Sequence, residues 1–228
     1  VRAAFGAVTR QATAAFGSAA VFCERYLGRV RHVEVQLFGD GAGRVVTLGT
    51  RDCTLQRHHQ KIVEEAPAPA LPTALEDQLL RAARTLAAAV SYRSAGTVEY
   101  LVDVATGRAH FLEVNPRLQV EHPVTEAVTG IDLVEWMLRL ALGEQVLDGV
   151  PDHGPAVRGH AVEARICAED PVHDHRRAGG LLTRVRFPEG VRVDSGIETG
   201  AVVTPHYDPL LAKVVATGPT RDAALTAL

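Results

Sequence analysis

Hydrophobic and polar residues alternate strictly over residues 32–38, HVEVQLF. This period of two predicts a half-buried strand, with Val33, Val35 and Leu37 on one face and polar side chains on the other. The glycine-rich GDGAG at 39–43 predicts a turn, and the apolar RVVTL that follows predicts the returning strand of a hairpin.

A longer period predicts the helices. Apolar residues at helical spacing predict helices at 1–16, 73–89 and 130–143, and another that begins at Thr220. Thr73, three residues before Glu76, predicts a capping box at the start of the second helix. Asp132 and Gly143 mark the start and the stop of the third. Both ends of the chain lie within helical patterns, so we expect it to be an excerpt of a longer protein.

Strand patterns become more frequent than helix patterns toward the end of the chain. GTVEYLVD (96–103) and HFLEVN (110–115) predict a second hairpin, residues 145–157 have the prolines and glycines of a linker, and the remainder is rich in strand patterns. The expected fold class is therefore α/β (α+β), divided into residues 1–155 and a smaller β-rich part at 156–228.

Composition excludes several classes of partner. The 228 residues are 46% hydrophobic and 22% charged, which is typical of a globular protein, and the formal net charge of −3 gives no reason to expect nucleic acid or a membrane surface as a partner. The three cysteines form no CxxC pair, which argues against a zinc site and favours reduced thiols. With no apolar run of membrane-spanning length and no signal-peptide pattern, we expect a cytoplasmic protein.

Two carboxylates face each other in the second predicted hairpin. If its turn centres on Thr106, Glu99 lies directly across from Glu113, and two like charges in that position repel. A divalent cation between them would remove the repulsion. With the amide oxygen of Asn115 they form the kind of oxygen set that Mg²⁺ takes beside nucleotide phosphates. The alternative is a face turned to water, where both carboxylates are solvated.

Two further clusters are suited to anions. QRHHQK at 56–61 could collect phosphate oxygens through charge-assisted hydrogen bonds, or form a solvated basic loop. After Pro116, which ends regular pairing, the polar face of the preceding strand continues with Arg117, Gln119 and Glu121. A buried arginine and carboxylate there would supply a charge stabiliser and a general base, or form a structural ion pair. All three clusters favour the same ligand, a metal-bound polyphosphate with an anionic reactant beside it.

Five segments resemble, in order, consecutive motifs of the biotin carboxylase component of biotin-dependent carboxylases. They are HVEVQLFGD, TRDCTLQRHHQKIVEEAPAP, FLEVNPRLQVEHPVTE, GHAVEARICAEDP and YDPLLAK, and they span nearly the whole chain. The resemblance implies an ATP-grasp fold, of which residues 1–155 would be the C-terminal part, followed at 156–228 by a biotin carboxylase C-terminal domain.

The same resemblance implies a reaction and its participants. In this family ATP and bicarbonate form carboxyphosphate, which breaks down to CO2 and phosphate, and biotin is then carboxylated. The expected cofactors are ATP, Mg²⁺ (or Mn²⁺) and biotin on a carrier domain, with bicarbonate as substrate. The expected partners are a biotin carboxyl carrier domain and a carboxyltransferase, with a homodimer left open. The motifs suit both acyl-CoA and urea carboxylases, so the final acceptor also stays open.

Matching motif positions implies a role for each site residue. Four would be catalytic: Lys61 near the phosphates and bicarbonate, Arg117 at the biotin enolate, Glu121 as the base for bicarbonate, and Arg165 near bicarbonate and biotin. The metal ligands would be Glu99, Glu113 and Asn115. Nucleotide contacts would come from Glu24, Arg25, Leu27, His32, Gln56, His59 and Leu101, and bicarbonate contacts from Gln119 and Val120.

Three positions depart from the family pattern. Pro116 stands where a Thr usually precedes the catalytic arginine, Thr50 stands where many members have Glu, and RRAGG at 176–180 replaces a PSPG-like stretch. No glycine-rich phosphate loop occurs in these residues, so we expect the excerpt alone to lack turnover, because its lid would be missing. Two alternatives remain: another ATP-grasp ligase, such as a carbamoyl phosphate-forming enzyme, or a non-catalytic remnant that serves assembly.

Overall fold

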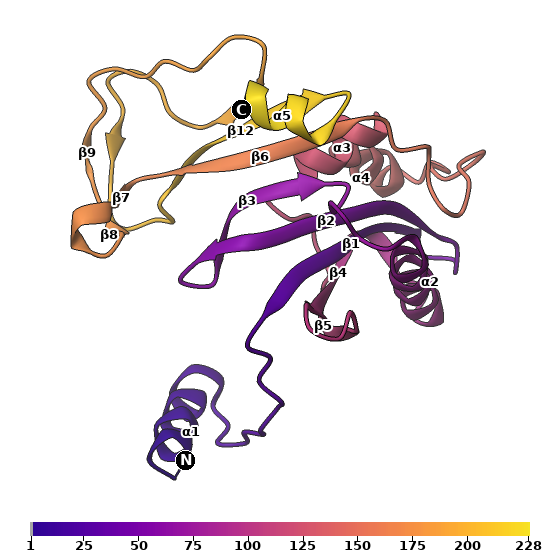
Figure 1. The fold of residues 1–228 in the computed structure, drawn as a ribbon, viewed down its shortest axis with the longest axis horizontal. Coiled ribbons are helices and arrows are strands. Elements are labelled where there is room, and N and C mark those ends of the chain that lie inside the picture. The colour runs from indigo at the N-terminus through magenta and orange to yellow at the C-terminus, as the bar shows by residue number, and fades with distance from the viewer. Residues whose placement is uncertain (1) are drawn as a thin grey trace.

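A computed structural model describes residues 2–228 (Figure 1). The helix predicted at 1–16 is α1 (Arg2–Phe16), and residue 1 lies outside the described residues. The other helices are α2 (Thr73–Ala89), α3 (His122–Thr129), α4 (Leu133–Ala141) and α5 (Arg221–Ala227), with a 3₁₀ turn at Pro171–His173. The strands are β1 (Val30–Asp40), β2 (Val45–Arg57), β3 (Gln60–Ala66), β4 (Arg93–Asp103), β5 (Ala109–Asn115), β6 (His160–Cys167), β7 (Glu169–Asp170), β8 (Arg176–Arg177), β9 (Gly180–Leu181), β10 (Arg192–Ser195), β11 (Val202–Val203) and β12 (Leu210–Gly218).

Eight strands form one antiparallel sheet in the order β10-β12-β6-β3-β2-β1-β4-β5. The hairpins β1–β2 and β4–β5 are the two that the sequence predicts. Strand β3 pairs with β6, so residues 1–155 and 156–228 contribute to the same sheet. Two short ladders, β9–β11 and β7–β8, form separate two-stranded sheets.

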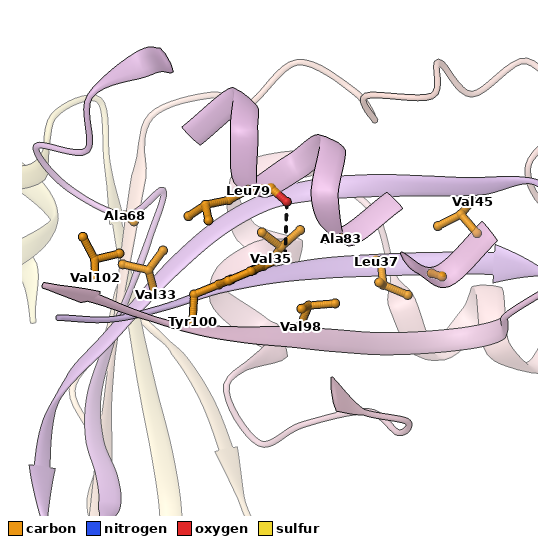
Figure 2. Close-up of a cluster of buried hydrophobic side chains, with 11 residues drawn as sticks. Val33, Val35, Leu37, Val45, Ala68, Leu79, Ala83, Val98, Tyr100 and Val102 are labelled. Atoms are coloured by element: carbon orange, nitrogen blue, oxygen red, sulfur yellow. Dashed lines mark hydrogen bonds between the residues drawn. The ribbon is translucent and has the colours of Figure 1, made fainter. Parts of the chain in front are cut away.

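Helix α2 covers one face of the central strands. Leu79 and Ala83 of α2 are buried against the apolar residues of β1 and β4, among them Val33, Val35 and Tyr100 (Figure 2). The side chains that alternate along β1 therefore do form an apolar face, as predicted. Removing several valine and leucine side chains from water is a main source of stability for this layer.

The start of α2 differs from the predicted capping box. The helix begins at Thr73 after Pro72, and no side chain caps it. The Glu76 carboxylate instead accepts a hydrogen bond from the Thr50 hydroxyl of β2 (2.8 Å), which in turn accepts one from the backbone N–H of Ala68 (3.2 Å). The capping-box prediction is wrong because a tertiary partner holds Glu76. Thr50, a departure from the family pattern, joins β2 to α2.

Both faces of β1 are buried, so the prediction of a half-buried strand is wrong. Glu34 and Gln36 are each 0% exposed although they point away from the apolar face. From α3 and the segment before it, the side chains of Thr125 and Gln119 reach Arg51, which lies among these polar residues. The pattern of β1 alone cannot reveal this cover, because α3 was not predicted.

Helix α4 and the turns confirm local sequence signals. Asp132 caps α4 by accepting a hydrogen bond from the backbone N–H of Glu135 (2.7 Å), and the chain turns after the helix at Gly143 (φ 88°). In the β1–β2 turn, Asp40 accepts hydrogen bonds from backbone N–H groups, and Gly41 has a positive φ of 83° that suits glycine.

The basic cluster at 56–61 forms the tip of the β2–β3 hairpin. His58 and His59 occupy the turn, and both have positive φ.

Strand β5 ends at Asn115, and residues 116–121 are not a strand, so the predicted continuation of its polar face is wrong. Because proline donates no backbone hydrogen bond, Pro116 ends the ladder rather than interrupting it.

None of the described helices is both long and apolar enough to cross a membrane.

Candidate active site

A cavity of about 280 Å³ brings together residues from β1 to β6 and from the segment between β5 and α3. Its lining includes every predicted catalytic residue, every predicted metal ligand and five of the predicted ligand contacts: Lys61, Arg117, Glu121, Arg165, Glu99, Glu113, Asn115, His32, Gln56, His59, Gln119 and Val120. Residues that are far apart in the sequence therefore meet at one place.

The predicted metal ligands lie together at one end of the β4–β5 hairpin. Glu99 is directly opposite Glu113 in the ladder, as the turn at Thr106 predicts. The Asn115 amide nitrogen donates to Oε1 of Glu99 (3.0 Å) and to Oε1 of Glu113 (3.1 Å). The amide therefore lies between two carboxylates, and turning it over would present an oxygen in place of the nitrogen. Two carboxylates and an amide oxygen fit Mg²⁺.

Lys61 connects three acids. Its Nζ donates to Glu34 (2.5 Å), Glu99 (2.9 Å) and Glu121 (2.5 Å). Burial lowers the pKa of Lys61, but the carboxylate of Glu34 and the other neighbouring negative groups outweigh burial and raise it well above its ordinary value. The ammonium group is therefore charged at neutral pH.

Glu121 is buried between two cations. Besides Lys61, its carboxylate accepts a hydrogen bond from Nη2 of Arg165 (2.9 Å), and only 2% of its surface is exposed. Burial raises the pKa of this carboxyl, yet the positive charges of Lys61, Arg51 and Arg165 lower it to about 2. Glu121 is consequently an ionised carboxylate at neutral pH, facing the same cavity as the metal ligands.

Arg117 does not occupy the place that the sequence suggested. It is exposed rather than buried, and among residues 2–228 its guanidinium donates only to the backbone oxygen of Leu118 (3.2 Å). The structural Arg117–Glu121 pair, which the sequence left open, is therefore absent from the described residues. The partners of Glu121 come instead from β3 and β6.

A second cavity of about 770 Å³ adjoins the first. Its lining includes most of the predicted nucleotide contacts: Arg25, Leu27, His32, Gln56, His59 and Leu101. Glu24 lines neither cavity. His32 lies between the two, with Nδ1 at 2.9 Å from the Gln56 amide and Nε2 at 2.8 Å from Glu99 Oε2. Burial raises the pKa of Glu99, but the contact with His32 and the charge of Lys61 outweigh burial and hold this pKa far below its usual range.

Sequence reasoning missed several residues of the buried polar network, among them Arg51 and Glu34. Arg51 is 0% exposed and donates to Glu34, Gln36, Thr97, Gln119 and Thr125. Glu34 binds both Arg51 and Lys61. The sequence offered one signal, which is that Glu34 shares the polar face of 32–38 with His32. The pairing of Glu34 with Arg51 could not be predicted, because it depends on a ladder register that the sequence does not specify.

Two family models match the chain. Residues 1–148 match the carbamoyl-phosphate synthase L chain, ATP binding domain, and residues 163–228 match the biotin carboxylase C-terminal domain.

Curated proteins and solved structures extend the match. Urea amidolyase of Saccharomyces cerevisiae is 47% identical over 227 residues, which cover 98% of this chain and 12% of that protein. Biotin carboxylase of Halalkalibacterium halodurans is 46% identical over 230 residues, covering 100% of this chain and 50% of that protein. The biotin carboxylase domain dimer of Hydrogenobacter thermophilus 2-oxoglutarate carboxylase, in complex with MgADP, ADP and bicarbonate, has a TM-score of 0.90 and 36% identity, covering 97% of this chain and 49% of that chain. The chain thus spans half or less of the length of these relatives.

Proposed function

We propose that this chain, which belongs to the biotin carboxylase family and has its ATP-grasp fold, supplies catalytic residues for ATP- and bicarbonate-dependent carboxylation of biotin. The observation that carries the proposal is the ion-pair chain Lys61–Glu121–Arg165, which lies beside the carboxylate–amide cluster in one cavity. A bound polyphosphate and a small anionic reactant would meet there.

The first group of the site would hold the nucleotide. Glu99, Glu113 and the amide of Asn115 would hold Mg²⁺, which supplies charge neutralisation for the phosphates when it is bound. Lys61, charged and held between Glu99 and Glu121, would bind phosphate or bicarbonate oxygens. The adjoining larger cavity, with Leu27 and Leu101 in its lining, would receive the nucleoside part.

The second group would act on bicarbonate. Glu121 would accept its proton, and the freed oxygen would attack the terminal phosphorus of ATP while ADP leaves. With a pKa of about 2, the carboxylate is a weak base as long as Lys61 and Arg165 bind it. Anionic substrates that draw these two cations away would raise its proton affinity, so substrate binding itself would activate the base. Arg117, exposed and without an acidic partner among residues 2–228, would be available to the ureido oxygen of biotin.

Cofactors, partners and domain division form part of the proposal. ATP, Mg²⁺ and bicarbonate are supported by the ligands named for the Hydrogenobacter thermophilus domain, which is also described as a dimer. Biotin on a carrier domain and a carboxyltransferase would complete the reaction. The two family matches, at 1–148 and 163–228, support a division near residues 155 and 156.

One observation favours a second candidate. The match of residues 1–148 is to an ATP-binding domain of carbamoyl-phosphate synthase, and such an enzyme needs the same metal and phosphate ligands. The biotin carboxylase C-terminal match favours the first candidate.

The experiment that separates the two measures ATP cleavage by the intact protein with bicarbonate, with and without free biotin. Our proposal predicts bicarbonate-dependent ADP formation that rises when free biotin is added. ADP formation that responds to ammonia and is indifferent to biotin would support the second candidate and refute the first.

A further inference from the structure

Two buried glutamates face each other in the sheet and do not line either cavity. Glu64 on β3 is directly opposite Glu163 on β6, and both residues are 0% exposed. Two like charges opposite each other destabilise a ladder, and burial makes a second charge still less favourable because water no longer solvates it. The pair therefore needs either compensating cations or a proton.

The surroundings of the pair are mostly apolar. Two positions along the ladder, on the same face, Ala66 and Ala161 pack against Val124 and Val128 of α3. On the other side of β6, the residue opposite Glu163 is Val215 of β12. Of the four carboxylate oxygens, three receive no hydrogen bond from the described residues, namely Oε2 of Glu64 and both oxygens of Glu163. Such an environment favours the neutral form of a carboxyl group.

Arg165 is the only cation in direct contact with the pair among residues 2–228. Its Nε donates to Glu64 (2.6 Å), and its Nη2 donates to Glu121 (2.9 Å). One guanidinium therefore serves two carboxylates and leaves Glu163 without a counter-charge of its own. Three other charged groups act on the pair from a greater distance, namely Glu121, Lys213 on β12 and Glu34 on β1, and the adjacent strand β2 carries the buried Arg51 and Cys53. Lys213 is held elsewhere, by the backbone oxygen of Val120 (2.8 Å) and by Asp194 (3.4 Å).

We propose that Glu64 and Glu163 share one proton at neutral pH, and that this pair positions Arg165 for its contact with Glu121. Glu64 is the partner that carries the charge, because Arg165 binds it. Glu163 is the partner that keeps the proton, because no cation contacts it within the described residues. The role of Arg165 in catalysis rests on the proposed function, whereas the shared proton does not.

The pKa shifts agree with placing the charge on Glu64 and the proton on Glu163. Burial raises the pKa of Glu163 to about 9, and the neighbouring charge of Glu64 adds to the rise. Burial also raises the pKa of Glu64, but the charge of Arg165 opposes the rise. When the pair loses its shared proton at alkaline pH, the added negative charge attracts Arg165 and weakens its hold on Glu121.

The first test measures stability against pH in the intact protein. Because the pKa of Glu163 is higher in the folded state than in the unfolded state, its contribution is complete below about pH 4.5 and is lost as pH rises toward about 9. Glu163→Gln mimics the protonated acid, so the stability of this variant minus that of the wild type should increase between about pH 6 and pH 9. Glu189→Gln, at an exposed site, should show no such trend. A variant that is less stable than the wild type by the same amount at every pH would overturn the shared proton.

The second test measures kcat and KM against pH in the same proteins. Glu163→Gln should keep the neutral-pH rate, and its rate relative to the wild type should rise by about tenfold between about pH 7.5 and pH 10, since the wild-type pair ionises over that range. Glu64→Gln should lower kcat already at neutral pH, because Arg165 loses its anchor, with little effect on KM for ATP. A confirmed stability trend with an unchanged alkaline rate profile in Glu163→Gln would overturn the positioning role alone. If the wild-type protein itself shows no biotin-dependent activity, the proposed function is refuted instead.

Discussion

At the scale of single residues, the site depends on paired charges that are buried or half-buried. Arg51, Lys61 and Arg165 are the cations, and each contacts at least one carboxylate at 2.9 Å or less. A buried ion pair is weak evidence for stability, because desolvation offsets much of the attraction. It is strong evidence that removing one member alone will be harmful, since the other charge is left buried without a partner.

Arg51→Met tests that point. The methionine would fill much of the same volume but remove the guanidinium that binds Glu34 at 2.5 Å, which leaves this carboxylate only one of its two close cations, Lys61, and takes a donor from Gln36. We expect the free energy of unfolding to fall by about 3–5 kcal/mol, measured by urea denaturation of the intact protein. The double variant Arg51→Met with Glu34→Gln should recover part of the loss. Equal stability of the single variant and the wild type would show that the network is dispensable for the fold.

Glu113→Ala tests the metal cluster. Glu113 is exposed at the cavity, and its contact with a side chain is the hydrogen bond from Asn115, so removing it should leave the fold intact. We expect Mg²⁺-nucleotide affinity to fall by at least about tenfold in a calorimetric titration. The matched control is Glu198→Ala, an exposed glutamate that lines neither cavity. Unchanged affinity in Glu113→Ala would remove this residue from the metal site.

Sequence reasoning succeeded where a contact is local in the chain. The Glu99–Glu113 pairing follows from one short turn, and the structure has that register even though a bulge follows at Tyr100. Glu34 and Arg51 also belong to a predicted hairpin, but a register shift between Val35 and Leu37 lies between this pair and the turn. Glu64 and Glu163 are joined by β3 and β6, which are far apart in the sequence. No local pattern specifies such a register, so these pairs were not predicted.

At the scale of elements, burial of both sheet faces organises the molecule. Helix α2 covers the apolar face of β1, while α3 and the segment before it cover the polar one. The alternation in β1 predicted the strand and its apolar face but not the second cover. Helix α3 has only eight residues and begins with His122 and Pro123, so its helical period is too short to be evident from the sequence.

Leu79→Ala tests the α2 layer. Leu79 is 2% exposed in the core of Figure 2, so its truncation should leave a cavity and lower the free energy of unfolding by about 2–5 kcal/mol. Leu86, on the same helix but 42% exposed, is the control, and Leu86→Ala should cost less than about 1 kcal/mol. Chemical denaturation of both variants provides the comparison. Equal losses would show that α2 is not anchored by the face that contains Leu79.

At the scale of the whole molecule, one sheet crosses the expected domain boundary. Strand β6 pairs with β3 on one side and with β12 on the other, and α3 packs on strands from both parts. The site depends on this continuity, because Arg165 from β6 reaches Glu121 from the first part. Because one sheet joins residues 1–155 to residues 156–228, we do not expect these two parts to be independent folding units.

Hydrogen exchange measures that coupling. We expect backbone amides of β3 and β6 to exchange with the same opening free energy, because the ladder between them cannot open in one strand alone. Amides of α1, which buries no residue, should exchange much faster and serve as the internal reference. Opening free energies for β3 and β6 that differ by several kcal/mol would indicate separate units.

In the proposed reaction, the carboxylate of Glu121, held between Lys61 and Arg165, removes the proton of bicarbonate while the neighbouring cluster holds the metal nucleotide. The most direct measurement compares bicarbonate-dependent ATP cleavage and ATP binding in the intact protein and in Glu121→Gln, with Glu189→Gln as control. We expect Glu121→Gln to lower the rate by about 10²–10⁴-fold and to change nucleotide affinity little. Normal turnover combined with weakened ATP binding would contradict this expectation.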